Sequence, residues 1–151
     1  MAYQGFRKAN VDDLSWIAGL EGLPENQFVA GEPLEAHEAH FKDNAFEYLI
    51  AEDDKGERAG YAQMVDSPND RIEWRRIIID CKGKGIGKAF MRDVIRHYRD
   101  NTQRLSIWLD VYADNARARH LYITLGFQET GEKPSPLFPG RMLVDMELDL
   151  N

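Results

Sequence analysis

The sequence contains little cysteine, no long apolar run and fewer basic than acidic residues. Its single cysteine, Cys81, excludes a disulfide framework and a four-cysteine zinc site within one chain. No apolar stretch approaches the length of a membrane span, and the first residues lack the apolar core of a signal peptide. We therefore expect a cytoplasmic protein without a membrane partner. The net charge of −7 argues against nucleic-acid binding and favours cationic ligands.

The length and composition of the chain are sufficient for one folded domain. The 151 residues are 43% hydrophobic and 30% charged, close to globular averages, so a core can form without disulfide support. No repeat, low-complexity segment or linker divides the chain. Residues 1–151 are therefore predicted to form a single domain.

The hydrophobic pattern predicts alternating strands and helices of a mixed α/β sheet. Short-range signals predict helices near residues 12–22, 33–44, 86–99 and 115–125, with Asn10 or Asp12 capping the first of them. Strands are predicted near residues 45–53, 58–67, 71–80, 104–112, 127–131 and 141–150, with a short one before the first helix. The expected order is β, α, α, β, β, β, α, β, α, β, β, which differs from a regular doubly wound sheet.

A glycine- and lysine-rich stretch, CKGKGIGKAF, lies between the predicted strand at 71–80 and the helix after it. Glycine occupies every second position from Gly83 to Gly87. Backbone N–H groups in the first turn of a helix converge on one point, and the helix dipole adds partial positive charge there. Glycines let an anion approach that point closely, so the stretch predicts a phosphate-binding loop.

Two common nucleotide motifs do not match this loop. A P-loop would need a glycine where Lys82 stands and a hydroxyl residue where Ala89 stands. A dinucleotide fingerprint that begins at Gly85 meets Phe90 where its third glycine belongs. The phosphate therefore belongs to a different class of ligand.

Two motifs together resemble the GNAT acetyltransferases. The residues KGKGIG, from Lys82 to Gly87, are similar to the pyrophosphate loop R/Q-x-x-G-x-G/A of that family, with Lys82 in place of Arg or Gln. Downstream, the residues NARARHLYITLGF (115–127) are similar to its signature N-x-x-A-x-x-L-Y-x-x-x-G-F. The resemblance is strong over residues 58–128, and toward both ends it rests on the order of elements.

The resemblance implies a fold and an activity. The fold would be a mixed, mostly antiparallel central sheet of about seven strands with about four helices, splayed between strands 4 and 5. Acetyl-CoA would be the co-substrate, without a metal, and the acceptor would be a primary amine of a small molecule or a protein N-terminus. The amine would attack directly in a ternary complex, and a homodimer is left open.

The resemblance also assigns the contacts to the co-substrate. The pyrophosphate would bind the loop formed by Lys82, Gly83, Lys84, Gly85, Ile86, Gly87 and Lys88. The backbones of Ile77, Ile78 and Ile79 would contact the pantetheine arm, and one of their N–H groups would polarise the thioester carbonyl. Their side chains are expected in the core. Asn115 matches a residue that contacts the same arm, but a plain helix cap explains it equally well.

Tyr122 matches the tyrosine that protonates the departing thiolate in many members of the family. The other interpretation is a tyrosine that packs beside Leu121 and Leu125.

Glu73, six residues before Ile79, is the candidate base, acting directly or through water. A base matters because an alkylamine of pKa ~10.4 costs about 4.6 kcal/mol to deprotonate at pH 7, against about 1 kcal/mol for an α-amine of pKa ~7.8. The other interpretation of Glu73 is an exposed strand acid beside Arg71 or Arg75.

Two further questions stay open at this point. His37 and His40 do not have the H-E-x-x-H spacing, so solvated or substrate-lining histidines are expected rather than metal ligands. The alternative function is a non-catalytic acyl-CoA-binding module with the same fold, and the presence of both Glu73 and Tyr122 argues against it.

Overall fold

The computed structural model describes residues 2–26, 29–80 and 85–151. Its elements, in chain order, are β1 (Tyr3–Lys8), α1 (Asp13–Glu21), a 3-10 turn (Pro24–Asn26), α2 (Leu34–Phe41), β2 (Phe46–Asp53), β3 (Arg58–Ser67), β4 (Arg71–Ile79), α3 (Ile86–Asn101), β5 (Ser106–Tyr112), α4 (Ala116–Thr124), β6 (Gln128–Pro134) and β7 (Met142–Asp149). Apart from the short turn, this is the predicted order. Lys82, Gly83 and Lys84 lie outside the described residues.

The strands form one mixed sheet in the order β1-β2-β3-β4-β5-β7-β6. The pairs β1–β2, β2–β3, β5–β7 and β6–β7 are antiparallel, whereas β4 and β5 are parallel. The sequence therefore predicted the fold class correctly. The β4–β5 register covers Arg71–Glu73 against Ser106–Trp108. The splay between these strands stays a prediction.

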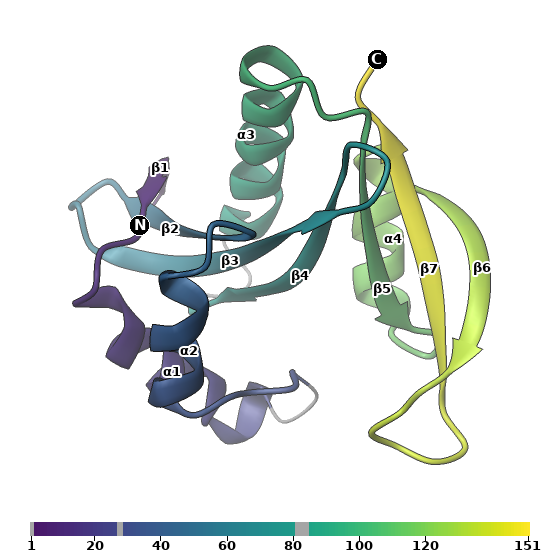
Figure 1. Cartoon of the computed structure of the whole chain (residues 1–151), viewed down its shortest axis with the longest axis horizontal. Helices are drawn as coiled ribbons and strands as arrows, with labels where there is room; N and C mark the ends of the chain where they lie inside the picture. The colour runs from purple at the N-terminus through teal and green to yellow at the C-terminus, as the bar shows by residue number, and fades with distance from the viewer. Residues whose placement is uncertain (1, 27–28, 81–84) are drawn as a thin grey trace. The chain divides into compact units, whose positions relative to one another are not determined.

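The chain falls into two compact units, and the prediction of a single domain stays a prediction. Unit 1 comprises Met1–Asp66 and Trp74–Val94. Figure 1 shows α1 and α2 packed beside each other against the strands of this unit. Helix α1 shares one core cluster with β2, β3 and β4, formed by Leu14, Ile17, Leu20, Tyr48, Ile50, Tyr61 and Ile78.

Unit 2 comprises Ser67–Glu73 and Ile95–Asn151. Its centre is the antiparallel pairing of β5, β7 and β6 (Figure 1). Helix α4 contains no buried residue, but Phe127 just after it is buried and its ring lies 6.0 Å from that of Tyr122. Gly126 has φ +105°, which explains the predicted stop of the helix at a glycine.

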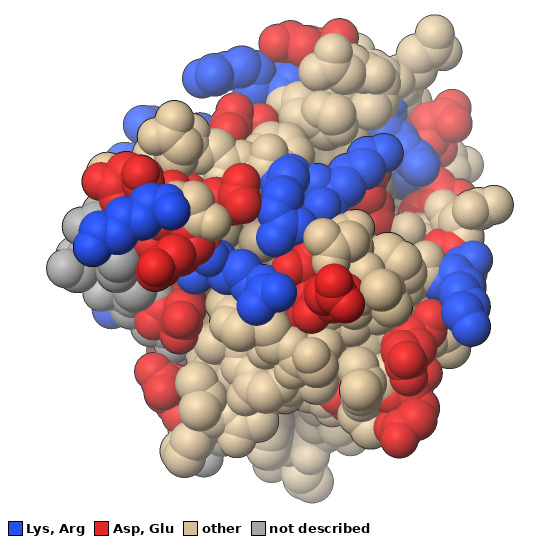
Figure 2. All heavy atoms as spheres, turned by 90° about the vertical axis from the view of Figure 1, so that its left-hand side faces the viewer, with Lys and Arg blue, Asp and Glu red and all other residues tan. Residues whose placement is uncertain are grey.

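The first helix has its side-chain cap at Asn10, one of the two predicted caps, and not at Asp12. Asp12 is at the N-cap position, but its side chain makes no capping hydrogen bond. Instead the Asn10 Oδ1 accepts the Asp12 N–H at 3.0 Å, and the Asp13 Oδ2 accepts the Asn10 N–H at 2.8 Å. Asp13 also binds Arg7 and Arg58, both at 2.8 Å, so the start of α1 is fixed to β1 and β3. Figure 2 shows acidic and basic side chains next to one another on this face.

Candidate active site

The predicted site residues divide between the two units. Ile77, Ile78 and Ile79 at the end of β4 belong to unit 1, as do the described loop residues Gly85–Lys88. Glu73, Asn115 and Tyr122 belong to unit 2.

The start of α3 has the features that an anion site requires. Gly85 has φ +71°, a backbone conformation that residues other than glycine rarely adopt. The helix then runs for 16 residues, and its first turn contains no acidic residue, so nothing in that turn opposes the positive end of the dipole. At Gly87 a Cβ would lie 3.3 Å from the Ile79 Cγ1, so glycine also lets α3 begin close to the end of β4.

The backbone of Ile77–Ile79 lies against β3 at unusually close range. A Cβ on Gly60 would lie 2.6 Å from the Ile78 carbonyl oxygen, which real Cβ atoms do not tolerate. The Asp80 N–H also donates to the Ala59 carbonyl at 2.8 Å. Gly60 thus lets β3 and the end of β4 approach closely, a feature that the sequence interpretation missed, although a glycine inside a predicted strand is a known signal of close approach.

Asn115 caps α4. Its side chain accepts the Ala118 N–H at 3.2 Å, and its backbone has left the helical region at φ −86° and ψ 75°. The capping interpretation is therefore confirmed, and contact with a pantetheine arm stays a prediction.

Tyr122 is half-buried on the same helix. Burial raises the pKa of its phenol to about 12, and the negative charge of Asp110 adds to this effect. The phenol therefore keeps its proton throughout the physiological range and can act as a hydrogen-bond donor.

Glu73 is half-buried on β4, opposite Trp108 in the parallel register. The Trp108 indole N–H donates to the Ser67 hydroxyl at 2.9 Å, and the Arg71 guanidinium lies 5.8 Å from its ring centre. The candidate base is therefore the sheet neighbour of the Trp108 ring, which is held by its hydrogen bond to Ser67 and already has the Arg71 cation near its face.

The comparisons with known proteins agree with this geometry. The family described as "Acetyltransferase (GNAT) family" matches residues 13–127, well over half of the chain. The chain belongs to the GNAT acetyltransferase family. The predicted resemblance is thereby confirmed.

Similar proteins include enzymes named for polyamines. A spermine/spermidine N(1)-acetyltransferase of Bacillus subtilis (strain 168) is 35% identical over 69 residues, which cover 44% of this chain and 45% of that protein. The match thus spans less than half of the length of this curated relative.

Solved structures share the whole fold of this GNAT chain. Spermidine N-acetyltransferase from Vibrio cholerae in complex with CoA and spermine has a TM-score of 0.83 and 22% identity, covering 96% of this chain and 94% of that one. A dodecameric structure of the Vibrio cholerae enzyme in an intermediate state has a TM-score of 0.81 and 23% identity, covering 96% and 92%.

One of the two histidines of α2 in this GNAT protein, His37, is not solvated. His37 is fully buried, so the expectation of a solvated histidine is wrong for this residue. Its Nε2 lies 2.7 Å from the Glu21 Oε1 and its Nδ1 lies 2.7 Å from the Tyr48 hydroxyl. The sequence offered only a weak signal, the i, i+4 spacing of His37 and Phe41, because Phe41 is itself 37% exposed although its ring lies 6.4 Å from that of Tyr48.

This buried polar network has one consistent direction. The Gln63 side-chain amide donates to the Tyr48 hydroxyl at 2.8 Å, which leaves the Tyr48 proton for His37 Nδ1. His37 then donates from Nε2 to Glu21, and Tyr61 donates to the same carboxylate. Each polar group in this chain of contacts has a hydrogen-bond partner, so the network joins α1 and α2 to β2 and β3 at limited cost.

Two arginines complete the network at its outer edge. Burial alone would raise the pKa of Glu21, but hydrogen bonds from His37, Tyr61 and the Glu32 N–H outweigh it and lower that pKa. Glu32 accepts from Arg76 at 2.7 Å and lies 3.5 Å from Arg75.

We expect Glu32 and Asp13 to make the protein sensitive to acid. Burial would raise the pKa of Glu32, but hydrogen bonds from Arg76 and His40 outweigh it and lower this pKa from 4.5 to about 2. In the same way, hydrogen bonds from Arg7 and Arg58 help to lower the pKa of Asp13 from 3.8 to about 2. Both pKa values are depressed by folding, so this stability is present above pH 4.5 and is lost as the pH falls toward 2. At ~1.36 kcal/mol per pKa unit, the loss is of the order of 2–3 kcal/mol for each group.

Urea unfolding at several pH values between 6 and 2.5 measures this loss. The Glu32→Gln variant should show a smaller fall in unfolding free energy over that range than the wild type. Parallel curves for the two proteins would contradict the assignment of Glu32.

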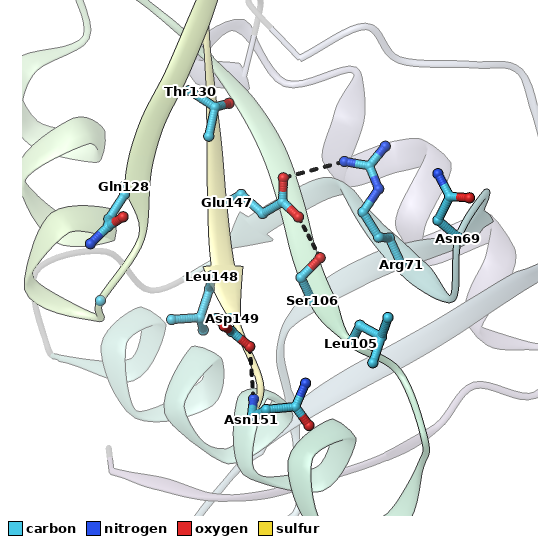
Figure 3. A pocket seen from close by; sticks show the side chains of 11 residues that line it. Asn69, Arg71, Leu105, Ser106, Gln128, Thr130, Glu147, Leu148, Asp149 and Asn151 are labelled. Atoms are coloured by element: carbon cyan, nitrogen blue, oxygen red, sulfur yellow. Dashed lines mark hydrogen bonds and ion pairs between the residues drawn. The ribbon is translucent and has the colours of Figure 1, made fainter.

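A groove in unit 2 lies apart from the predicted site residues. It has a volume of about 750 Å³ and is bordered by the beginnings of β4 and β5 and the end of β7. Figure 3 shows the Glu147 carboxylate directed toward Arg71 and Ser106, which both bind it. None of the predicted site residues lines this groove.

No helix in the described part of the chain is long and apolar enough to cross a membrane. Within the same residues, no group of three or more histidine, cysteine or acidic side chains could hold a metal ion.

Proposed function

We propose that this GNAT protein transfers the acetyl group of acetyl-CoA to a primary amine, and that its acceptors are polyamines or related small polycations. The observation that carries the proposal is the beginning of α3, where Gly85 at φ +71° opens a long helix without an acid in its first turn. Such a helix end binds a pyrophosphate without help from side chains. The family match joins this anion site to acetyl transfer.

The residues of both units suit acetyl-CoA. Gly85, Ile86, Gly87 and Lys88 would hold the pyrophosphate, together with Lys82–Lys84 outside the described residues. Ile77–Ile79 would bind the pantetheine arm through their backbone, and Gly60 would hold that strand segment in place. Asn115 would contact the pantetheine arm with its side-chain N–H₂ group, since its capping bond uses only the side-chain oxygen.

The transfer requires one proton to leave the amine and one to reach the sulfur. The amine nitrogen attacks the thioester carbonyl carbon, a C–N bond forms, and the C–S bond breaks with its electron pair on sulfur. Glu73, directly or through water, would accept the amine proton. An alkylamine of pKa ~10.4 gains most from this base, because about 4.6 kcal/mol of deprotonation cost must be met at pH 7.

The raised pKa of Tyr122 limits what this residue can do. A phenol at about 12 holds its proton more firmly than a thiol, whose ordinary pKa is ~8.5. Complete transfer to the thiolate would therefore be uphill. We assign Tyr122 the role of donating a hydrogen bond to the sulfur as negative charge develops there, with solvent supplying the proton in the end.

The acceptor class follows from charge and from the relatives. The net charge of −7 favours polycations. The curated relative and the solved structures are named for spermine and spermidine. A thiol-release assay with acetyl-CoA tests the proposal on spermine, spermidine, a diamine, a monoamine and a peptide α-amine. The proposal expects the highest kcat/KM for the polyamines.

The same assay separates the alternative function. A protein that binds acetyl-CoA but releases no thiol with any amine is the non-catalytic acyl-CoA-binding module. Preference for the peptide α-amine would keep the enzyme and reject the polyamine acceptor.

Replacing Glu73 tests the base. Glu73→Gln should lower kcat/KM for spermidine about 10²-fold at pH 7, the low end of general-base effects. The deficit should shrink toward pH 10, because free amine is then plentiful without a base.

The measurement is a pH–rate profile of both proteins, with Glu132→Gln as the control for charge. Glu132 is an exposed acid of the same unit, so its replacement should leave the profile unchanged. If Glu73→Gln has the wild-type profile, the proton acceptor is water.

A further inference from the structure

Lys133 of β6 holds its ammonium group in a cage of one indole and two carboxylates. The Nζ lies 5.6 Å from the centre of the Trp108 ring, 3.1 Å from the Asp110 Oδ2 and 3.0 Å from the Asp145 Oδ1. An aromatic face flanked by carboxylates is a favourable environment for an amine cation. The cage residues come from three strands, β5, β7 and β6.

The two carboxylates of the cage face each other across the sheet. Asp110 and Asp145 are direct partners in the β5–β7 register, an arrangement that is destabilising without a cation. Partial burial alone would lower the Lys133 pKa, but hydrogen bonds and charges from Asp145 and Asp110 outweigh it and raise the pKa. Even with Lys133 bound, two carboxylates and one ammonium leave a net charge of −1.

The cage adjoins both proposed catalytic residues. Trp108, the aromatic residue of the cage, pairs with Glu73 in the β4–β5 register. Asp110, one of the two carboxylates of the cage, helps to raise the pKa of the Tyr122 phenol through its negative charge. If Glu73 and Tyr122 act as proposed, the cage lies near the amine that reacts, and all four of these residues belong to unit 2.

We infer that Lys133 is a specificity-determining residue: its ammonium occupies the position that a second ammonium of a di- or polyamine acceptor takes, and such an acceptor displaces it. The inference rests on the proposed amine acceptor. It goes further by naming the subsite and the group that competes for it. A monoamine has no second ammonium and cannot use the cage.

The exposure of Lys133 makes displacement feasible. Its side chain is 40% exposed, against 33% for Arg71, whose guanidinium lies 5.8 Å from the centre of the same Trp108 ring. Ion pairs at such exposure contribute little, because solvent screens them and the long side chain loses entropy. A lysine also binds as a mobile point charge, without the fixed fork of an arginine.

A purely structural role for Lys133 predicts something different. In that case it only relieves the repulsion between Asp110 and Asp145, and its removal destabilises the fold without changing amine selectivity. The two roles are separated by comparing a diamine with a monoamine.

The experiment is calorimetric titration of 1,4-diaminobutane and 1-butylamine into the protein saturated with CoA, so that no transfer occurs. Lys133→Met should bind the diamine about fivefold more tightly than the wild type does, equivalent to about 1 kcal/mol. The affinity for butylamine should change less than twofold. Lys133→Arg, which keeps the charge and stacks more firmly on the indole, should bind the diamine more weakly than the wild type.

Two controls complete the design. Lys42→Met removes an exposed lysine of unit 1 and measures the effect of net charge alone. Thermal unfolding with and without the diamine covers the case in which Lys133→Met folds poorly, since the diamine should then stabilise the variant more than the wild type.

An unchanged or weaker diamine affinity in Lys133→Met would overturn the inference, as would an equal gain for butylamine. These results are independent of catalysis, because no acetyl group is present. Absence of thiol release with every amine would instead remove the proposed function and leave the binding result standing.

Discussion

Replacing Gly85 by valine is expected to lower the affinity for acetyl-CoA by about 10²-fold. Gly85 has φ +71°, and a β-branched residue there costs about 1–3 kcal/mol, which corresponds to roughly 10- to 100-fold in affinity. The valine side chain would also stand where the phosphates approach the N-terminus of α3. No charge changes, so a loss would not report on electrostatic attraction by side chains.

The Gly85→Asn variant separates the two causes. Asparagine tolerates positive φ far better than valine, but it still adds a side chain. If both variants lose affinity, close approach of the ligand is the requirement; if asparagine alone retains it, the requirement is conformational. Calorimetry with acetyl-CoA gives the affinities, and circular dichroism confirms folding. Wild-type affinity in the folded valine variant would remove the anion site from α3.

Replacing Tyr122 by phenylalanine should slow turnover by roughly 10²-fold while the affinity for acetyl-CoA changes little. The ring and its contact with Phe127 at 6.0 Å are kept, and only the hydroxyl is lost. Because the phenol pKa is about 12, the hydroxyl contributes as a hydrogen-bond donor to the developing thiolate. The loss should therefore be nearly constant from pH 7 to pH 9.

Single-turnover kinetics beside equilibrium binding measure the two effects separately. Equal losses of rate and affinity would indicate a binding role. An unchanged rate would leave Tyr122 as a packing residue. Ile123→Ala is a suitable control, since that neighbour on α4 is 53% exposed and outside the proposed site.

The secondary structure could be predicted almost completely because its signals are local. Helix α3 is an example: Ile86, Phe90, Val94 and Tyr98 recur at helical spacing, and all four are buried. Strand β4 is similar, since its increasingly apolar sequence identified a central strand. The start of α1 was predicted only as a choice between Asn10 and Asp12; in the structure the Asn10 side chain accepts the Asp12 N–H, and the Asp13 carboxylate accepts the Asn10 N–H.

The conformations at the start of α3 and at the cap of α4 were predictable because the motifs there describe backbone, whereas the site itself stays a prediction. The glycines after β4 and the asparagine that begins α4 have fixed offsets from their elements, so position in sequence was enough. The role of His37 was not predictable, because its partners Glu21 and Tyr48 lie on other elements. A polar residue in a helix is ordinarily solvated, and only packing decides otherwise.

The sequence by itself determined the elements, the family and the loop that would bind a pyrophosphate. All of these depend on periodicity or on spacing within a few residues. The tertiary structure alone decided that Asp110 and Asp145 face each other, and that Lys133 lies between them on Trp108. The physical reason is the strand order β5-β7-β6, which makes neighbours of side chains that are distant in the chain. Alternating polar residues predict an exposed strand face, but only the register shows which charges meet there.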